Sequence, residues 1–230
     1  MIVGNGLLAS YFNKYSNNDN YLVFASGVSN SNELNTKCFF REETLLRETI
    51  NSESDKHFIY FSSCDVIYCE QMKKPYYFHK KRMEKIIADN CRNFTIFRLP
   101  QIISKSNNPH LLVNYFKDSI LNKKQFNIWC NATKNLVHID DVFLMVDYAI
   151  NNMEVSSKTI NIVNSEYYSV DEIVNTISDF LGLNYKAHYM DKGVQVCYKC
   201  LFSSEIIYKS GVDFGADYIK KALEKSWLNE

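Results

Sequence analysis

Near the N-terminus, the stretch Ile2-Val3-Gly4-Asn5-Gly6-Leu7-Leu8-Ala9 reads as a short apolar strand, a glycine turn and the start of a helix. Glycines let the backbone of such a turn approach a pyrophosphate closely, and the N-terminus of the following helix favours the negative charge. A turn that binds nothing can have the same residues, so the stretch alone is weak evidence for a dinucleotide site. It predicts that the fold begins with a β-α unit.

Strands and helices alternate after this turn. Continuous apolar runs predict strands, whereas apolar residues at helical spacing, or a proline at the start of such a run, predict helices. The expected strands are 21–25, 57–61 and 94–99, and the expected helices are 7–15, 39–50 and 75–89. This alternation predicts an α/β fold in which helices cover both faces of a parallel sheet.

The residues after 110 follow a different pattern. Helices are expected at 111–121, 142–150, 170–181 and 216–227, and strands at 125–129 and 159–163. Ser169 is a candidate cap for the third of these helices, and Gly182 is a candidate stop. No linker or repeat separates the two halves, so we expect the second half to pack directly on the sheet.

Composition argues against several classes of protein. The 230 residues include 26 basic and 26 acidic side chains, and a net charge of zero gives no general attraction to nucleic acid or to an anionic membrane. No apolar run approaches the ~20 residues of a membrane span. Seven scattered cysteines and the lack of an export signal predict free thiols in a reducing cytoplasm. The Cys197-Tyr-Lys-Cys200 pair lacks further zinc ligands, so no metal is expected.

The expected helix at 75–89 carries the strongest chemical pattern. Tyr76, Lys80 and Glu84 stand four residues apart, along one stripe of the helix. A lysine one turn away can lower the pKa of a tyrosine, which can then exchange a proton with a substrate oxygen. An ordinary surface helix can show the same spacing, and Tyr77 with Lys81 forms a second pair turned ~100° around the helix.

The neighbouring segments make the pattern specific. Pro75-Tyr76-Tyr-Phe-His-Lys80-Lys-Arg-Met-Glu84 resembles the proline-tyrosine-x-x-x-lysine-x-x-x-glutamate helix of the extended short-chain dehydrogenase/reductase superfamily, in its NAD-dependent nucleotide-sugar epimerase/dehydratase branch. Further stretches resemble that branch in its own order between residue 2 and about residue 227: Phe97-Arg-Leu-Pro100, Asn135-Leu-Val-His138-Ile-Asp140-Asp141-Val, Asn161-Ile-Val-Asn164 and Tyr168-Ser-Val-Asp-Glu-Ile.

The resemblance implies a doubly wound Rossmann-type parallel sheet with a small mixed C-terminal lobe. Residues 1–110 would form a truncated dinucleotide-binding core, and residues 111–230 would form mostly the substrate lobe. The implied function is an NAD(P)-dependent epimerase, dehydratase or reductase that acts on a nucleotide-linked sugar by hydride transfer in surface polysaccharide biosynthesis. The alternative is a catalytically degenerate relative that binds a sugar nucleotide or a partner enzyme without turnover.

The resemblance also assigns roles to residues. Tyr76 would be the acid/base, Lys80 would hold the nicotinamide ribose and tune the tyrosine, and Ser63 would hydrogen-bond the reacting carbonyl. Counting back from Tyr68 puts Cys64 in the place of Ser63, but a thiol is a poor donor. The expected contacts of NAD or NADP are Gly4, Gly6, Leu7, Leu8, Ala25, Ser26, Gly27, Ser62, Tyr76, Lys80, Leu99 and Pro100.

One part of the family pattern is missing. Only 14 residues separate Gly6 from Tyr21, so the second and third strands of the doubly wound order 3-2-1-4-5-6 have no room. The first strand would then lie at a sheet edge, and the acid that binds the adenosine ribose would have no strand end to carry it. Asp19 is the nearest acid, but it lies in a polar turn where we expect it to be solvated. We therefore expect weak or unusual dinucleotide binding, or an adenine wall supplied by a partner subunit. The resemblance and the bare edge both favour a homodimer.

Few arginines are available for a diphosphate. After the Tyr76 helix the only arginines are Arg92 and Arg98, and neither is well placed, which argues against a diphosphate clamp of the usual kind. Lysines could substitute with weaker geometry, at positions 105, 117, 123, 124 and 134.

Overall fold

The computed structural model describes residues 1–106, 108–199 and 203–228. Cys200 of the Cys-x-x-Cys pair lies outside these residues. Within them, no helix is both long and apolar enough to cross a membrane.

The centre of the fold is a parallel five-stranded sheet in the order β1-β2-β3-β4-β9. Its strands are β1 (Ile2–Val3), β2 (Tyr21–Phe24), β3 (His57–Ser63), β4 (Phe94–Leu99) and β9 (Lys158–Asn161). The predicted parallel α/β fold is confirmed. The first strand lies at the edge of the sheet, as the short spacing after the glycine turn predicted.

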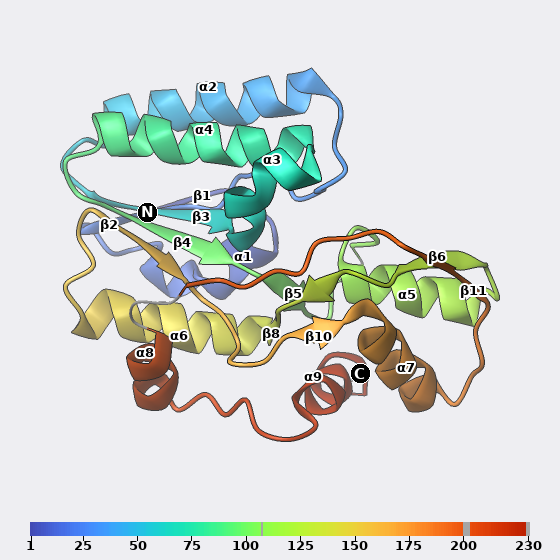
Figure 1. The fold of residues 1–230 in the computed structure, drawn as a ribbon. Helices are drawn as coiled ribbons and strands as arrows, with labels where there is room; N and C mark the ends of the chain where they lie inside the picture. Colours follow the sequence, from blue (N-terminus) through green and yellow to red (C-terminus); the bar gives the residue numbers. More distant parts are fainter. Residues whose placement is uncertain (107, 200–202, 229–230) are drawn as a thin grey trace.

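Helices cover both faces of this sheet (Figure 1). α2 (Thr36–Ser52) and α4 (Pro75–Asn90) lie side by side on one face, while α1 (Leu7–Tyr11) and α6 (Ile139–Asn152) lie on the other. Side chains along a strand point alternately to the two helix layers. On β2, Leu22 and Phe24 pack with the α2/α4 layer, whereas Val23 packs with α6. A strand buried on both faces reads as an unbroken apolar run, which is the pattern found in the sequence.

Among the residues described after 100, the second half adds three two-stranded sheets and four helices besides α6. The bounds of these elements are β5 (Gln101–Ile103), α5 (Leu112–Leu121), β6 (Phe126–Trp129), β7 (Thr133–Lys134), β8 (Leu136–His138), β10 (Tyr168–Ser169), α7 (Val170–Leu181), β11 (Ala187–Met190), α8 (Ser203–Ser210) and α9 (Tyr218–Trp227). β5 pairs with β8, β6 with β11 and β7 with β10. β9 and α6 return to the central sheet and its lower layer (Figure 1).

Several helix boundaries differ from expectation, and two of these differences have a local cause. The helix expected over 7–15 ends at Tyr11, and a 3-10 turn covers Asn13–Tyr15, because Phe12 leaves the helical conformation and is fully buried. α6 begins at Ile139 rather than Val142, since the His138 side chain caps it by accepting a hydrogen bond from the Asp140 N–H at 3.2 Å. α7 has the expected Ser169 cap and ends at Gly182.

A 3-10 helix, η2 (Cys64–Tyr68), and a short helix, α3 (Cys69–Met72), connect β3 to α4. Asp65 lies in this connection with only 2% of its surface exposed. Its carboxylate accepts hydrogen bonds from the Tyr77 hydroxyl at 3.0 Å and the Tyr198 hydroxyl at 2.6 Å. Asp65 thus joins the connection to α4 and to the segment before residue 200.

The glycine turn after β1 needs its first glycine for a steric reason. Gly4 has a φ of +125°, and a Cβ on Gly4 would stand 2.5 Å from the Ala25 carbonyl oxygen at the end of β2. A Cβ on Gly6 would meet nothing within 4 Å. The two glycines of the turn therefore have different structural requirements.

We predict that Gly4→Ala lowers the free energy of unfolding by roughly 2–4 kcal/mol, because it combines an unfavourable φ with a backbone clash. Gly6→Ala, the matched control, should cost less than about 1 kcal/mol as a change at a helix N-cap. Urea unfolding followed by circular dichroism measures both values. Equal losses for the two variants would contradict this account of the turn.

Candidate active site

A cleft of about 380 Å³ lies where the central strands end. It is lined by the residues that follow β1, β2, β3 and β4, and by one face of α4. The carboxyl ends of parallel strands meet at one edge of a sheet, which brings segments distant in sequence together there. We call this cavity the strand-end cleft.

Nearly all the residues expected at a cofactor line the strand-end cleft. They are Gly6, Leu7, Leu8, Ala25, Ser26, Gly27, Ser62, Tyr76, Lys80, Leu99 and Pro100, and Ser63 lies there with them. Gly4 does not line the cleft, and its close approach to Ala25 gives it a role in backbone packing. The structure thus brings the predicted residues to one place, while their chemical roles stay predictions.

The two Tyr/Lys pairs of α4 have different surroundings. Tyr76 and Lys80 both line the cleft, with the Lys80 ammonium 5.9 Å from the centre of the Tyr76 ring. Tyr77 also reaches the cleft wall, but it is 3% exposed and its hydroxyl is bonded to Asp65. Lys81 lies outside the lining, with its ammonium 3.8 Å from the Cys69 sulfur. The geometry therefore favours the first pair for chemistry in the cleft.

Two hydroxyls and one thiol at the end of β3 have different surroundings. Cys64 is 1% exposed, lies outside the cleft lining and donates its thiol to the Arg98 carbonyl at 3.2 Å. Ser63 lines the cleft, and its oxygen accepts a hydrogen bond from the Asp65 N–H at 3.3 Å. Ser62 also lines the cleft, and its hydroxyl is buried with no partner among the described residues. An unpaired buried hydroxyl at a cavity wall is suited to a ligand.

Lys80 forms a buried ion pair with the carboxylate of Glu42, a residue that the sequence did not single out. The Glu42 side chain is 0% exposed, and its Oε1 accepts hydrogen bonds from Lys80 Nζ at 2.9 Å and from the Tyr60 hydroxyl at 2.8 Å. Its Oε2 accepts from the Val28 N–H at 2.8 Å and from His79 Nε2 at 3.0 Å. Lys80 Nζ also donates to the Tyr60 oxygen at 3.0 Å.

This pairing moves the pKa values of the cleft residues. Burial alone would raise the pKa of Glu42, but the Lys80 ammonium and the hydrogen bonds from His79 and the Val28 N–H hold the pKa well below its usual range. Burial opposes the charge of Lys80, yet Glu42 keeps the pKa of the ammonium above its ordinary value. The pKa of Tyr76 is raised by burial, lowered by Lys80 and raised again by Glu42 and Asp65, with a net upward shift.

Two functional candidates were missed in the sequence, and one of them left a signal. Glu42, Leu46 and Thr49 recur at helical spacing and are all buried on α2, so Glu42 belongs to the buried stripe of its helix. Arg41, the preceding residue, lines the cleft and makes no ion pair within the described part of the chain. Arg41 has no such signal, because in the sequence it looks like one member of a solvated charged run.

The charge of its lining distinguishes the strand-end cleft from the larger cavity described below. The cleft lining has Arg41, Lys80 and His110 but no carboxylate among the described residues. Arg98 is not available to a ligand, because it forms a two-bond pair with Glu84 at 2.9 and 2.6 Å. None of the five lysines suggested for a diphosphate lines this cleft.

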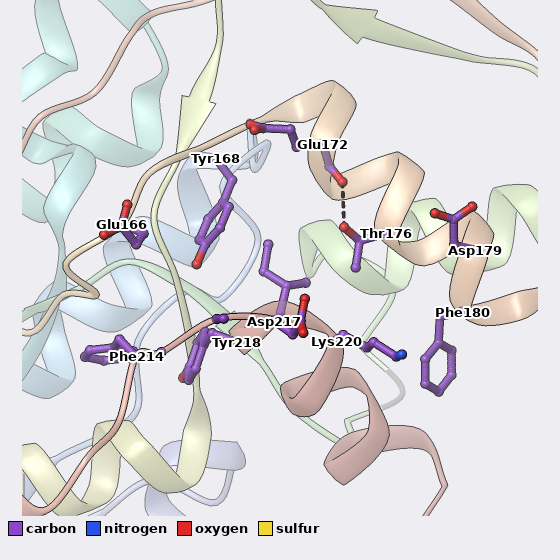
Figure 2. A pocket seen from close by; sticks show the side chains of 13 residues that line it. Glu166, Tyr168, Glu172, Thr176, Asp179, Phe180, Phe214, Asp217, Tyr218 and Lys220 are labelled. Carbon is purple, nitrogen blue, oxygen red and sulfur yellow. Dashed lines mark hydrogen bonds between the residues drawn. The ribbon is translucent and has the colours of Figure 1, made fainter.

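A larger cavity of about 810 Å³ lies between α7 and α9 (Figure 2), and Tyr76 is not among the residues that line it. Its wall includes four carboxylates and one lysine: Glu166, Glu172, Asp179, Asp217 and Lys220. An anionic ligand is repelled by such a wall. The described residues contain no group of three or more His, Cys, Asp or Glu side chains that could hold a metal ion.

Comparison with known proteins gives no match by sequence and many by structure. No protein-family model and no curated protein matches the chain. UDP-glucose 4-epimerase of Thermus thermophilus, solved with NAD, matches with a TM-score of 0.69 and 12% identity over 93% of this chain and 78% of that one. For dTDP-glucose 4,6-dehydratase of Bacillus anthracis, solved with NAD, the values are 0.67, 12%, 97% and 78%.

The RMD protein of Pseudomonas aeruginosa, solved with NADPH, matches with a TM-score of 0.66 and 11% identity over 90% of this chain and 82% of that chain. At these identities the likeness establishes the fold. The chain has the Rossmann-type architecture of the nucleotide-sugar epimerases and dehydratases, as its motifs predicted.

Proposed function

We propose that this chain binds NAD or NADP together with a nucleotide-linked sugar in the strand-end cleft, and that it acts as an epimerase, dehydratase or reductase. The observation that carries the proposal is the meeting of three predicted parts in one cavity: the glycine turn, the hydroxyls that end β3, and the Tyr76/Lys80 face of α4. The fold shared with enzymes solved with NAD or NADPH supports the same function.

The cleft residues fit a dinucleotide on one side only. The unpaired Ser62 hydroxyl and the open space beside Gly6 suit the approach of a polar ligand. Arg41 and Lys80 supply positive charge, and the absence of carboxylates from the described lining removes repulsion. The same absence means that no acid is present there to bind an adenosine ribose. We therefore keep the expectation of weak or unusual dinucleotide binding.

The mechanism follows from the residues around Tyr76. When bound, the nicotinamide supplies hydride chemistry at the sugar carbon. Tyr76 would take the proton of a sugar hydroxyl when it is oxidised and return the proton when a carbonyl is reduced. Ser63 would donate a hydrogen bond to the same sugar oxygen. Lys80 would stabilise the deprotonated tyrosine and hold the ribose with the ammonium hydrogen that Glu42 and Tyr60 do not use.

One observation favours the alternative of a binding protein without turnover. Lys80 is neutralised by Glu42, so it lowers the pKa of Tyr76 less than an unpaired lysine would. The intact Tyr76, Lys80 and Ser63 in one cleft favour the enzyme. A homodimer, a partner-supplied adenine wall and a role in surface polysaccharide biosynthesis belong to the proposal as predictions. Sedimentation with and without cofactor tests the first two.

We predict that Tyr76→Phe lowers turnover by roughly 100- to 10,000-fold, because the phenyl ring cannot carry the proton. The assay is a panel of UDP- and dTDP-linked sugars with NAD and with NADP, followed by cofactor absorbance and product chromatography. Tyr77→Phe is the matched control, since the Tyr77 hydroxyl is bonded to Asp65, and its turnover should stay within about tenfold of the wild type.

Retained turnover in Tyr76→Phe would contradict the mechanism. A wild-type protein that binds members of the panel but converts none of them would favour the binding alternative.

Removing the positive charge of Arg41 should weaken cofactor binding. We expect Arg41→Gln to raise the Kd for NAD or NADP about tenfold or more, as the loss of one charge-assisted contact would. Arg47→Gln is the control on the same helix, because Arg47 pairs with Glu43 and lies outside the cleft lining. Calorimetric titration measures both.

An unchanged Kd in Arg41→Gln would remove Arg41 from the site. Submicromolar NAD binding by a demonstrated monomer would contradict the expected weakness of the adenosine side.

A further inference from the structure

Glu42 is a carboxylate with every position for a donor filled. Each of its two oxygens accepts two hydrogen bonds, from Lys80 and Tyr60 on one side and from Val28 and His79 on the other. An ionised carboxylate in a site without solvent is stable only with such compensation. The side chain is therefore held in one position and ionised.

The position of the Lys80 ammonium is also fixed by its contacts. It lies between Glu42 and Tyr60, at 2.9 and 3.0 Å from their oxygens and 4.9 Å from the centre of the Tyr60 ring. A Cβ on Gly27 would stand 2.5 Å from Lys80 Nζ and 3.2 Å from Glu42 Oε1. Glycine at position 27 thus leaves the space that the ion pair occupies at the cleft wall.

We propose that Glu42 is a positioning residue for Tyr76: it fixes the Lys80 ammonium at the cleft wall and, through that ammonium, sets the pH at which Tyr76 releases its proton. The catalytic part of this inference rests on the proposed function. The proton equilibrium itself does not, because it exists in the free protein.

The direction of the effect follows from the charges around Tyr76. Lys80 alone favours the phenolate, whereas the Glu42–Lys80 pair has a much weaker field because its charges cancel. The other charged or titratable groups near this cluster come from every element around it: Arg41 from α2, Asp65 from η2, Tyr60 from β3, Glu84, His79 and Tyr77 from α4, and Arg98, which pairs with Glu84. Removing the charge of Glu42 alone leaves the Lys80 ammonium without its counter-charge while Asp65 is unchanged, so the phenolate becomes more stable.

The test uses tyrosine labelled with carbon-13 at Cζ and needs no substrate. The spectrum of Tyr76→Phe identifies the Tyr76 signal among the 16 tyrosines. We expect the titration midpoint of Tyr76 to fall by about 1 pH unit in Glu42→Gln. Glu43→Gln removes a charge one residue away, where Glu43 binds Arg47 and Arg82 on the outer side of α2, and should leave the midpoint unchanged.

A folded Glu42→Gln protein with an unchanged midpoint would overturn the proposal, as would an equal shift in Glu43→Gln. Circular dichroism checks folding first. If Glu42→Gln does not fold, Gly27→Ala displaces Lys80 Nζ and keeps both charges. The Tyr76 midpoint then has to move if the position of the ammonium sets it, and a constant midpoint overturns the inference.

Failure of this test and failure of the proposed function are distinguishable. The tyrosine titration can disprove the role of Glu42 while sugar-nucleotide turnover is intact. Conversely, the expected shift can be observed in a protein that turns over no substrate.

Discussion

A buried carboxylate is the constraint on which the N-terminal half of this structure depends. Removing a carboxylate from water costs several kcal/mol, which only a full set of donors offsets. The donors of Glu42 are the Val28 N–H after β2, the Tyr60 hydroxyl on β3, and the neighbouring residues His79 and Lys80 on α4. Because all must be in place at once, α2, α4 and the two strands have one relative arrangement. That arrangement also forms one wall of the strand-end cleft.

Much of the fold was predictable, because the central strands are buried on both faces. The run 94–99 has the bounds of β4, and the short segment before Tyr21 correctly placed β1 at an edge. Local rules were less reliable where tertiary contacts decide. Phe12 leaves the helix to enter the core, and α6 begins at Ile139, before the expected Val142, with His138 as its cap. Two-residue strands such as β7 have no signal of their own.

The candidate site was predictable to the extent that chemistry follows a motif. Tyr76, Lys80 and the strand-end serines meet as their order along the chain suggested. Contacts between elements that are distant in the sequence are different, because the sequence does not say which buried residues meet. Glu42 reaches Lys80 across 38 positions of sequence, and Cys64 turns toward the Arg98 carbonyl instead of the cleft. The sequence favoured Ser63 over Cys64 because a thiol is a poor donor, and in the structure Ser63 lines the cleft whereas Cys64 is buried outside its lining.

The edge position of β1 has a consequence for the cycle of the proposed enzyme. In the proposed enzyme, a cofactor bound beside β1 would have no further strand of the described residues on one side, so it would exchange with solvent more readily than one enclosed by further strands. A reaction that returns its hydride to the same sugar works best with a cofactor that stays bound. A net reduction or oxidation requires the cofactor to leave after every turnover. Of the reactions proposed for this chain, a net reduction or oxidation would gain most from an open sheet edge, because the cofactor would then act as a co-substrate.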